Sequence, residues 1–197
     1  MSLRLLQAIA VLLAALVVGL ALFWQPELPE RPLPKAATGA GDFTLQSADG
    51  PVSLKDFRGK LVLLYFGYTF CPDVCPTSLA STAGGLNLLK PEELAKVAML
   101  FISVDPERDT PARLKEYAEF FHPAIVGVTG SPQSVAEIAR RYGVFYARQK
   151  VATAGDGYVV DHTSDTYLVA PSGEVLGKIP HAAPPEQVVA EIRKRLN

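Results

Sequence analysis

The chain lacks an excess of charge of either sign and has no cluster of basic residues. Its 19 lysine and arginine residues and 20 aspartate and glutamate residues give a net charge of -1, and no run of Lys or Arg is interleaved with aromatic residues. The electrostatic footprint of a nucleic-acid-binding protein is therefore absent. No internal repeat is present either. With 197 residues, of which 49% are hydrophobic and 20% charged, the composition is that of one globular domain plus an additional element.

Cysteine is also scarce, because the chain has only Cys71 and Cys75. A disulfide between them would close a very short loop and restrain little of the unfolded chain, so it would add little stability. The same closeness suits redox chemistry or metal chelation. Histidine is equally limited, with His122, His162 and His181 as the candidates for any further nitrogen ligand.

The additional element is a long apolar run at the N-terminus. Residues 5–23 contain Gln7 as the only clearly polar side chain, and 19 helical residues at about 1.5 Å each match a bilayer core of about 30 Å. We expect a transmembrane anchor, with residues 1–4 in the cytoplasm and the rest of the chain outside. A cleaved signal peptide is the alternative, because Gly19-Leu20-Ala21 has the small-x-small pattern of a cleavage site.

The absence of an Arg-rich, Ser-rich leader argues against an organelle transit peptide. We therefore expect a single-pass protein of the bacterial inner membrane whose domain faces the periplasm or outer surface. Residues 24–40 carry four prolines without apolar periodicity and predict a stiff linker.

Residues 41–197 show strands that alternate with helices. This pattern predicts a three-layer α/β domain with a mixed central sheet. The expected strands are a hairpin over 43–54 and runs over 61–68, 97–104, 125–129, 159–169 and 175–179; the expected helices begin at Pro76, Pro111, Pro132 and Pro184.

Both cysteines lie where the apolar strand 61–68 enters a helix. The carboxyl end of a central strand is where α/β sheets place ligands, and a helix N-terminus lowers the pKa of a thiol. Pro72 and Pro76 stiffen the loop, so both sulfurs can be presented on one side. Two thiolates with one imidazole would suit Cu(I), whereas zinc would need a fourth ligand or an open water position.

Each histidine has a plainer interpretation as well. His122 stands between a helix and a proline, and is expected to be a solvated cation at the helix end. His181 is expected to be exposed in a loop. His162 precedes an apolar strand and, taken alone, is more typical of an ordinary hydrogen-bonded histidine than of a ligand.

Three acidic positions near these motifs are ambiguous. Asp73 is a turn residue or an extra ligand in an oxidised state, and Asp161 is a surface carboxylate or a hydrogen-bond acceptor that orients His162. The segment from Asp105 to Asp109 follows a buried strand on the same face as the cysteines. It either ends that strand and caps the next helix or forms a docking surface.

Three stretches together resemble the Sco/SenC family of cytochrome oxidase assembly proteins: Gly67-Tyr68-Thr69-Phe70-Cys71-Pro72-Asp73-Val74-Cys75-Pro76, Ser103-Val104-Asp105-Pro106-Glu107-Arg108-Asp109-Thr110 and Val160-Asp161-His162-Thr163. The resemblance implies a membrane-tethered thioredoxin-like fold with added N-terminal and C-terminal hairpins. It also implies that Cys71, Cys75 and His162 bind copper, as Cu(I), Cu(II) or both. The copper would pass to the binuclear copper centre of cytochrome c oxidase.

Two functions stay open at this stage. A copper metallochaperone would use all three residues, with the copper-site subunit of the oxidase and another periplasmic copper carrier as partners. A thiol-disulfide oxidoreductase would use Cys71 and Cys75 as its catalytic pair, would need no histidine, and would act on the oxidase copper site or exchange with a thioredoxin-like reductant. A peroxidase is disfavoured because Thr69 stands only two residues before Cys71.

Overall fold

The computed structural model describes residues 4, 5, 7, 41–150, 157–170 and 172–196. The chain divides into two compact units, 1–33 and 34–197. Apart from Leu5 and Gln7, which are helical, the expected anchor 5–23 and the whole expected linker 24–40 lie outside the described residues. Within the described part of the chain, no helix is both long and apolar enough to span a bilayer.

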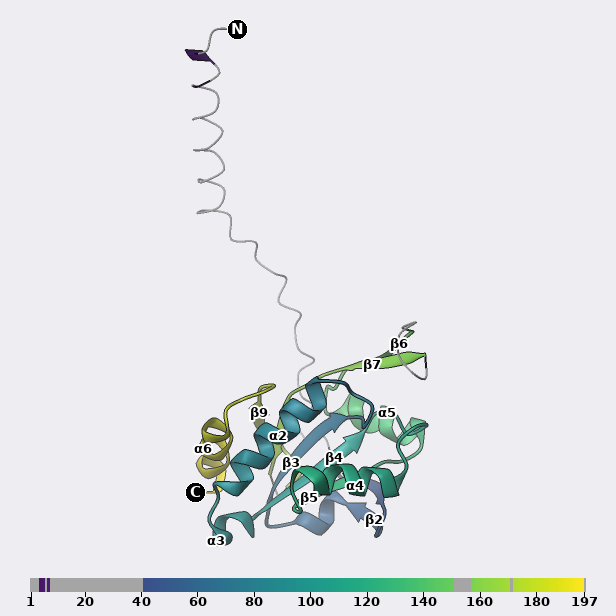
Figure 1. Ribbon diagram of the computed structural model, residues 1–197. Coiled ribbons are helices and arrows are strands. Elements are labelled where there is room, and N and C mark those ends of the chain that lie inside the picture. Colours follow the sequence, from purple (N-terminus) through teal and green to yellow (C-terminus); the bar gives the residue numbers. More distant parts are fainter. Residues whose placement is uncertain (1–3, 6, 8–40, 151–156, 171, 197) are drawn as a thin grey trace. The chain divides into compact units, whose positions relative to one another are not determined.

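The second unit is built on a five-stranded mixed sheet in the order β5-β4-β3-β8-β9 (Figure 1). Strands β3, β4 and β5 are parallel, whereas β8 runs antiparallel to both β3 and β9. The strands of this sheet are β3 (Leu61–Gly67), β4 (Val97–Ser103), β5 (Ile125–Val128), β8 (Thr166–Val169) and β9 (Val175–Ile179). Every residue of β3 and β4 is buried, as expected of central strands covered on both faces.

Helices cover both faces of the sheet. They are α2 (Val74–Asn87), the short α3 (Pro91–Leu94), α4 (Pro111–Phe121), α5 (Pro132–Arg141) and α6 (Pro185–Leu196). Neighbouring residues of β3 show the two faces: Tyr65 stacks on Phe101, which in turn contacts Tyr117 of α4, while Phe66 packs against Tyr142 at the end of α5. The predicted three-layer arrangement with a mixed sheet is confirmed.

Several helix and turn signals lie where the sequence places them. Thr110 and Ser131 accept hydrogen bonds from backbone N–H groups in the first turns of α4 and α5, each with proline as the next residue. The predicted hairpin is formed by β1 (Thr44–Ser47) and β2 (Gly50–Ser53), followed by the 3-10 helix η1 (Leu54–Phe57). At the other end of the domain, β8 and β9 form the C-terminal hairpin.

Three elements differ from what the sequence led us to expect. The run 159–169 is not one strand but two, β7 (Tyr158–His162) and β8, because the polar residues 163–165 separate a peripheral pairing from the central sheet. Strand β6 (Tyr146–Lys150), the antiparallel partner of β7, was not predicted, since its residues are largely polar and none is buried. Helix α2 begins at Val74 instead of Pro76, which is tolerated because the first N–H groups of a helix have no intrahelical acceptor.

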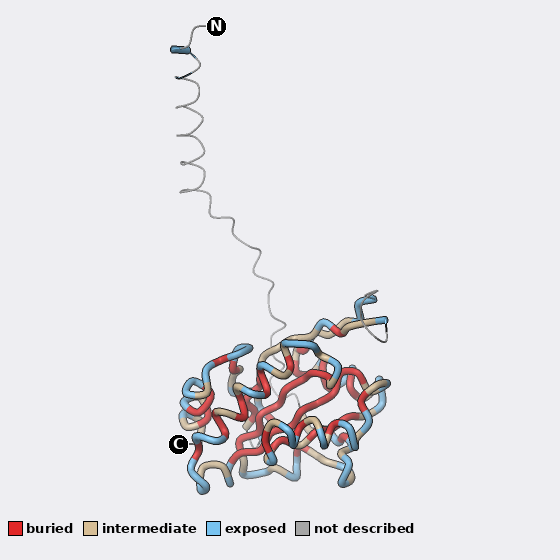
Figure 2. Tube along the Cα trace, in the orientation of Figure 1, coloured by how far each residue is buried: buried red, intermediate tan, exposed pale blue. Residues whose placement is uncertain are grey.

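Strands β6 and β7 form a separate ribbon beside the main sheet, at the end of β3 from which α2 starts (Figure 1). Burial is continuous through the central strands and sparse in this ribbon (Figure 2). The ribbon is attached through Tyr68, whose hydroxyl accepts a hydrogen bond of 3.1 Å from the N–H of Val160. One ribbon residue, His162, thereby reaches the carboxyl end of β3.

Candidate metal centre

The two cysteines occupy different environments on either side of the start of α2. Cys71 is half-buried in the loop after β3, and Cys75 is the second residue of α2 and fully buried. The backbone N–H of Cys75 donates to the Cys71 sulfur at 3.3 Å. The helix N-terminus thus supplies a donor to the sulfur, as expected at a site that favours a thiolate.

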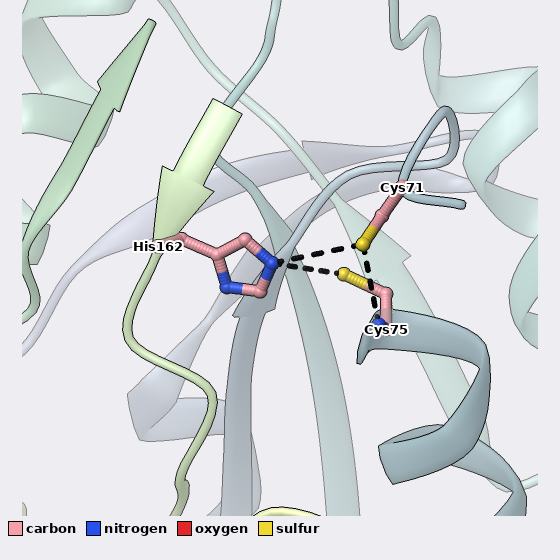
Figure 3. A group of neighbouring side chains, drawn as sticks. All are labelled: Cys71, Cys75 and His162. Atoms are coloured by element: carbon pink, nitrogen blue, oxygen red, sulfur yellow. Dashed lines mark hydrogen bonds between the residues drawn. The ribbon is translucent and has the colours of Figure 1, made fainter. Parts of the chain in front are cut away.

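His162, the last residue of β7, reaches both sulfurs (Figure 3). Its Nε2 lies 3.2 Å from Cys75 Sγ and 4.0 Å from Cys71 Sγ. Its Nδ1 lies 3.0 Å from the carbonyl oxygen of Thr163, which can only accept a hydrogen bond. Nδ1 therefore carries a proton, and Nε2 is the ring nitrogen that faces the sulfurs.

The wall of the site is aromatic and closely packed. The rings of Tyr65 and Tyr68 each contact His162 edge-on, with centroid distances of 6.2 and 5.9 Å. Gly67 leaves room for the buried sulfur, because a Cβ at this position would lie 2.6 Å from Cys75 Sγ and 2.9 Å from Tyr65 Cε1. A side chain at residue 67 would displace one of these groups.

The two thiols differ in acidity. The pKa of Cys71 is lowered to about 4, first by a hydrogen bond from the Cys75 thiol, with burial opposing and His162 adding to the shift. Burial, followed by the interaction with Cys71, raises the pKa of Cys75 far above its ordinary value. Before any metal binds, the pair therefore holds one thiolate and one thiol.

The segment from Asp105 to Asp109 supports both halves of the site. The buried carboxylate of Asp109 accepts hydrogen bonds from the Thr69 backbone at 3.1 Å, the Thr69 hydroxyl at 2.6 Å and the Ser103 hydroxyl at 2.6 Å. This fixes the loop two residues before Cys71. Asp105 is equally buried; it pairs with Arg108 and accepts a hydrogen bond of 2.9 Å from the Tyr158 hydroxyl at the start of β7. The two carboxylates thus hold the loop and the ribbon to the same turn.

The remaining candidates lie outside the cluster. The expectation of a solvated His122 cation is wrong: its ring is buried, burial lowers its pKa, and Nδ1 accepts from the N–H of Ala124 at 3.0 Å. His181 is exposed, as predicted. Asp73 accepts from the Thr77 hydroxyl at 3.2 Å, and Asp161 is exposed while the Thr163 carbonyl orients His162.

Sequence reasoning missed the tyrosines around the ligands. Tyr65 lies in β3 and Tyr68 directly follows this strand, and the apolar run explains both as core residues. Tyr158 lies in the ribbon, which has no clear burial pattern. The alternation within Tyr65-Phe66-Gly67-Tyr68 was the available signal, because it places Tyr65 and Gly67 on one face of β3.

The donor set fits a soft metal ion. The ligand atoms of Cys71, Cys75 and His162 all lie within 4.8 Å of one another, and this is the group of possible metal-ligating residues found in the described part of the chain. Two sulfurs and an imidazole nitrogen favour copper over hard cations, which prefer oxygen. The fold and the cluster together define the class: a thioredoxin-like α/β domain with a two-cysteine, one-histidine site.

Comparison with known proteins identifies the family. The chain belongs to the SCO1/SenC family, whose model matches residues 31–197. The mitochondrial protein SCO2 homolog of Bos taurus is 42% identical over 166 residues, which are 83% of this chain and 62% of that protein. The chain thus spans less than two thirds of that relative's length.

Solved structures agree with this assignment. The copper-bound structure of Arabidopsis thaliana ScoI is 36% identical with a TM-score of 0.74, and the match covers 81% of this chain and 98% of that one. BsSco, a member of the Sco family of cytochrome c oxidase assembly proteins in which a disulfide switch was identified, is 27% identical with a TM-score of 0.63. That match covers 84% of this chain and 98% of BsSco.

Proposed function

We propose that this protein is a copper carrier in the assembly of cytochrome c oxidase, and that it binds copper through Cys71, Cys75 and His162. The convergence of these three ligand atoms from β7 and the start of α2 carries the proposal. The copper found in the related ScoI structure supports it. The copper-site subunit of the oxidase is the proposed recipient.

The arrangement suits a carrier because two of its three ligands, Cys71 and His162, are partly exposed, while Cys75 is buried. Three ligands leave an open position where a partner's thiolate or imidazole can bind before the carrier's own ligands leave. Copper would then move by successive ligand exchange. We place the domain on the outer side of the bacterial inner membrane, held there by residues 5–23.

A direct test is an anaerobic Cu(I) titration of the full chain in detergent, with X-ray absorption at the metal. We expect one copper per chain with two sulfur ligands and one nitrogen ligand. Loss of groups that only orient a ligand weakens metal binding about 10- to 100-fold, so loss of the ligand in His162→Ala should cost about 100-fold or more.

The matched control is His122→Asn, which removes a histidine outside the cluster and keeps an acceptor for the N–H of Ala124. It should bind copper like the original chain. Unchanged affinity in His162→Ala would remove the histidine from the site.

A second candidate function is reduction of the disulfide at the oxidase copper site. The low pKa of Cys71 favours it, as does the disulfide switch identified in BsSco. The Cys71 thiolate would attack the partner disulfide and release one partner thiolate. Cys75, on losing its proton, would then displace the second, leaving a Cys71–Cys75 disulfide and a reduced partner.

An experiment that uses a soluble copper-site domain of the oxidase subunit as the recipient distinguishes the two functions. Delivery requires copper transfer to the reduced domain and should fail in His162→Ala. Full reducing activity toward the oxidised domain in His162→Ala, without copper transfer by the original chain, would favour the reductant.

A further inference from the structure

The side chain of Arg108 lies beside both segments that carry the candidate ligands. Arg108 belongs to the turn between β4 and α4, and its side chain is only 11% exposed. Its Nε is paired with the carboxylate of Asp105, which is fully buried. This ion pair fixes the guanidinium group against the domain core.

On one side, the guanidinium group contacts the ribbon. Its central carbon lies 3.7 Å from the ring centroid of Tyr158, and its Nη1 donates a hydrogen bond of 3.2 Å to the carbonyl oxygen of the same residue. Tyr158 is the first residue of β7, and His162 is the last. Arg108 therefore holds both the ring and the backbone of Tyr158 at the start of the strand that ends in the imidazole ligand.

On the other side, the same group contacts the cysteine loop. The guanidinium carbon lies 4.8 Å from the ring centroid of Phe70 and 5.6 Å from that of Tyr68. Phe70 directly precedes Cys71. A guanidinium group within about 6 Å of an aromatic centroid is attracted to the ring, and more strongly where water is largely excluded. One side chain thus contacts aromatic residues of the loop and of the ribbon.

We propose that Arg108 is a positioning residue that clamps the Cys71 loop to the His162 ribbon, so that the sulfur and imidazole ligands are held as one unit. The inference deepens the proposed function, because it concerns how the candidate ligands of that site are held. Arg108 is not itself a ligand, since a guanidinium group stays protonated and offers no acceptor.

The clamp has a defined effect on metal binding. Ligands that are already held in place bind a metal more tightly, because no further ordering has to accompany binding. The guanidinium group ties the two segments together only while it contacts both of them. Loss of its contact with either the loop or the ribbon should therefore release the imidazole from the sulfurs.

The first experiment is a double-mutant cycle for Cu(I) affinity in the full chain, measured by competition with a Cu(I) chelator. Phe70→Ala opens the clamp on the loop side, and Tyr158→Ala opens it on the ribbon side. Because either change alone opens the clamp, the loss of affinity in the double variant should fall short of the product of the two single losses by about threefold or more. A smaller shortfall would overturn the proposal.

Arg113→Gln is the matched control. The Arg113 guanidinium carbon also lies over the Phe70 ring, at 4.1 Å from its centroid, and its Nε donates to the Thr69 hydroxyl at 2.8 Å. Both of these contacts are with the loop. The effects of Arg113→Gln and Tyr158→Ala on affinity should therefore multiply. A threefold shortfall in this cycle too would indicate a general loosening of the loop and would overturn the clamp.

Arg108 needs a variant that keeps its ion pair. Arg108→Ala would leave the buried carboxylate of Asp105 without its closest cation, which destabilises the fold by itself. Arg108→Lys keeps a positive charge and lacks the planar guanidinium group that contacts the rings. In Arg108→Lys, the shortfall between Phe70→Ala and Tyr158→Ala should drop below about threefold. A shortfall that persists would assign the coupling to another contact and overturn the proposal.

Hydrogen exchange tests the clamp without copper. The N–H of Val160 donates to the Tyr68 hydroxyl across the junction between ribbon and loop. In the reduced, metal-free full chain, Phe70→Ala and Arg108→Lys should each speed exchange of this N–H about threefold or more, as followed by NMR, whereas Arg113→Gln should not. Unchanged exchange in Phe70→Ala would overturn the proposal. Faster exchange in variants of a chain that binds no copper would uphold the clamp and reject the proposed carrier function.

Discussion

At the scale of single residues, the two cysteines of the site differ in exposure and in acidity. Cys71 is half-buried and receives hydrogen bonds from the Cys75 N–H and thiol, whereas Cys75 is buried under Tyr65 and above Gly67. An accessible thiolate next to a protected thiol suits stepwise chemistry, in which the first sulfur binds and the second completes the site. The same order applies to copper capture and to disulfide exchange.

This difference in exposure and acidity predicts selective alkylation. In the reduced, metal-free chain, iodoacetamide should modify Cys71 at pH 6 and leave Cys75 intact, with a rate that rises through about pH 4 as the thiolate of Cys71 forms. An ordinary thiol would show this rise near pH 8.5. Mass spectrometry of peptides from quenched samples gives the rate for each residue.

Cys75→Ala tests the cause of that pKa. The hydrogen bond from the Cys75 thiol is the largest contribution to the low pKa of Cys71, so the midpoint of its alkylation rate should rise in this variant. A midpoint near pH 8 in the original chain would contradict the assignment of Cys71 as the thiolate.

At the scale of elements, the site joins two parts of the domain that belong to different sheets. The cysteines follow β3 in the central sheet, while His162 ends the ribbon of β6 and β7. Asp105 and Arg108 hold this ribbon through Tyr158: the hydroxyl donates to Asp105, and the guanidinium carbon of Arg108 is 3.7 Å from the ring centroid. The position of the imidazole therefore depends on these contacts of Tyr158, in addition to the hydrogen bond from Val160 to Tyr68.

Replacement of Tyr158 should leave the position of His162 less well fixed and leave the reactivity of the thiols unchanged. We expect Tyr158→Ala to weaken copper binding about 10- to 100-fold, the range for groups that orient a metal ligand, while alkylation of Cys71 at pH 6 continues. Tyr158→Phe keeps the ring on Arg108, so it should reduce copper affinity less than Tyr158→Ala does. Gln149→Ala, an exposed change in the same ribbon, is the control.

Competition titrations against a Cu(I) chelator measure these affinities. Tyr158→Ala with the affinity of the original chain would show that the ribbon holds His162 without this contact.

The sequence predicts the elements whose signals are local. The apolar runs of β3 and β4 and the Thr110-Pro111 and Ser131-Pro132 caps lead directly to the observed strands and helices. The ribbon is different, because β6 is stabilised by pairing with β7 and its own residues are polar. The burial of His122 likewise depends on tertiary packing, which a single residue between a helix and a proline does not reveal.

The residues of the candidate site likewise divide into those that the sequence predicts and those that depend on tertiary contacts. Cys71 and Cys75 were predictable from their spacing at the end of β3, whereas His162 depended on family resemblance, since 87 residues separate it from Cys75. The roles of Tyr65 and Asp109 were beyond the sequence, because each is explained equally well as a core residue or a helix-proximal acid until its contacts are known.

At the scale of the whole molecule, we propose separate tasks for the domain that holds the candidate ligands and for the apolar N-terminal run. Residues 34–197 form a compact unit that has its own hydrophobic core and contains all three candidate ligands. Residues 5–23 are 19 uncharged positions with Gln7 as the only clearly polar side chain, enough for about 30 Å of helix. For a carrier that serves a membrane-bound oxidase, a tether would confine the search for its partner to the membrane surface and raise its effective concentration.

The proposed tether predicts both membrane retention and orientation. Expressed in a bacterium, the full chain should sediment with membranes, resist extraction by alkaline carbonate and dissolve in detergent. A C-terminal alkaline phosphatase fusion should be active, because this reporter folds on the outer side.

A variant in which Arg residues replace Leu12 and Leu13 breaks the apolar run at a cost of about 2.5 to 3.5 kcal/mol each and should lose both properties. Recovery of a soluble exported chain that begins at Leu22 would instead identify residues 1–21 as a cleaved signal, because cleavage after Gly19-Leu20-Ala21 leaves that residue first.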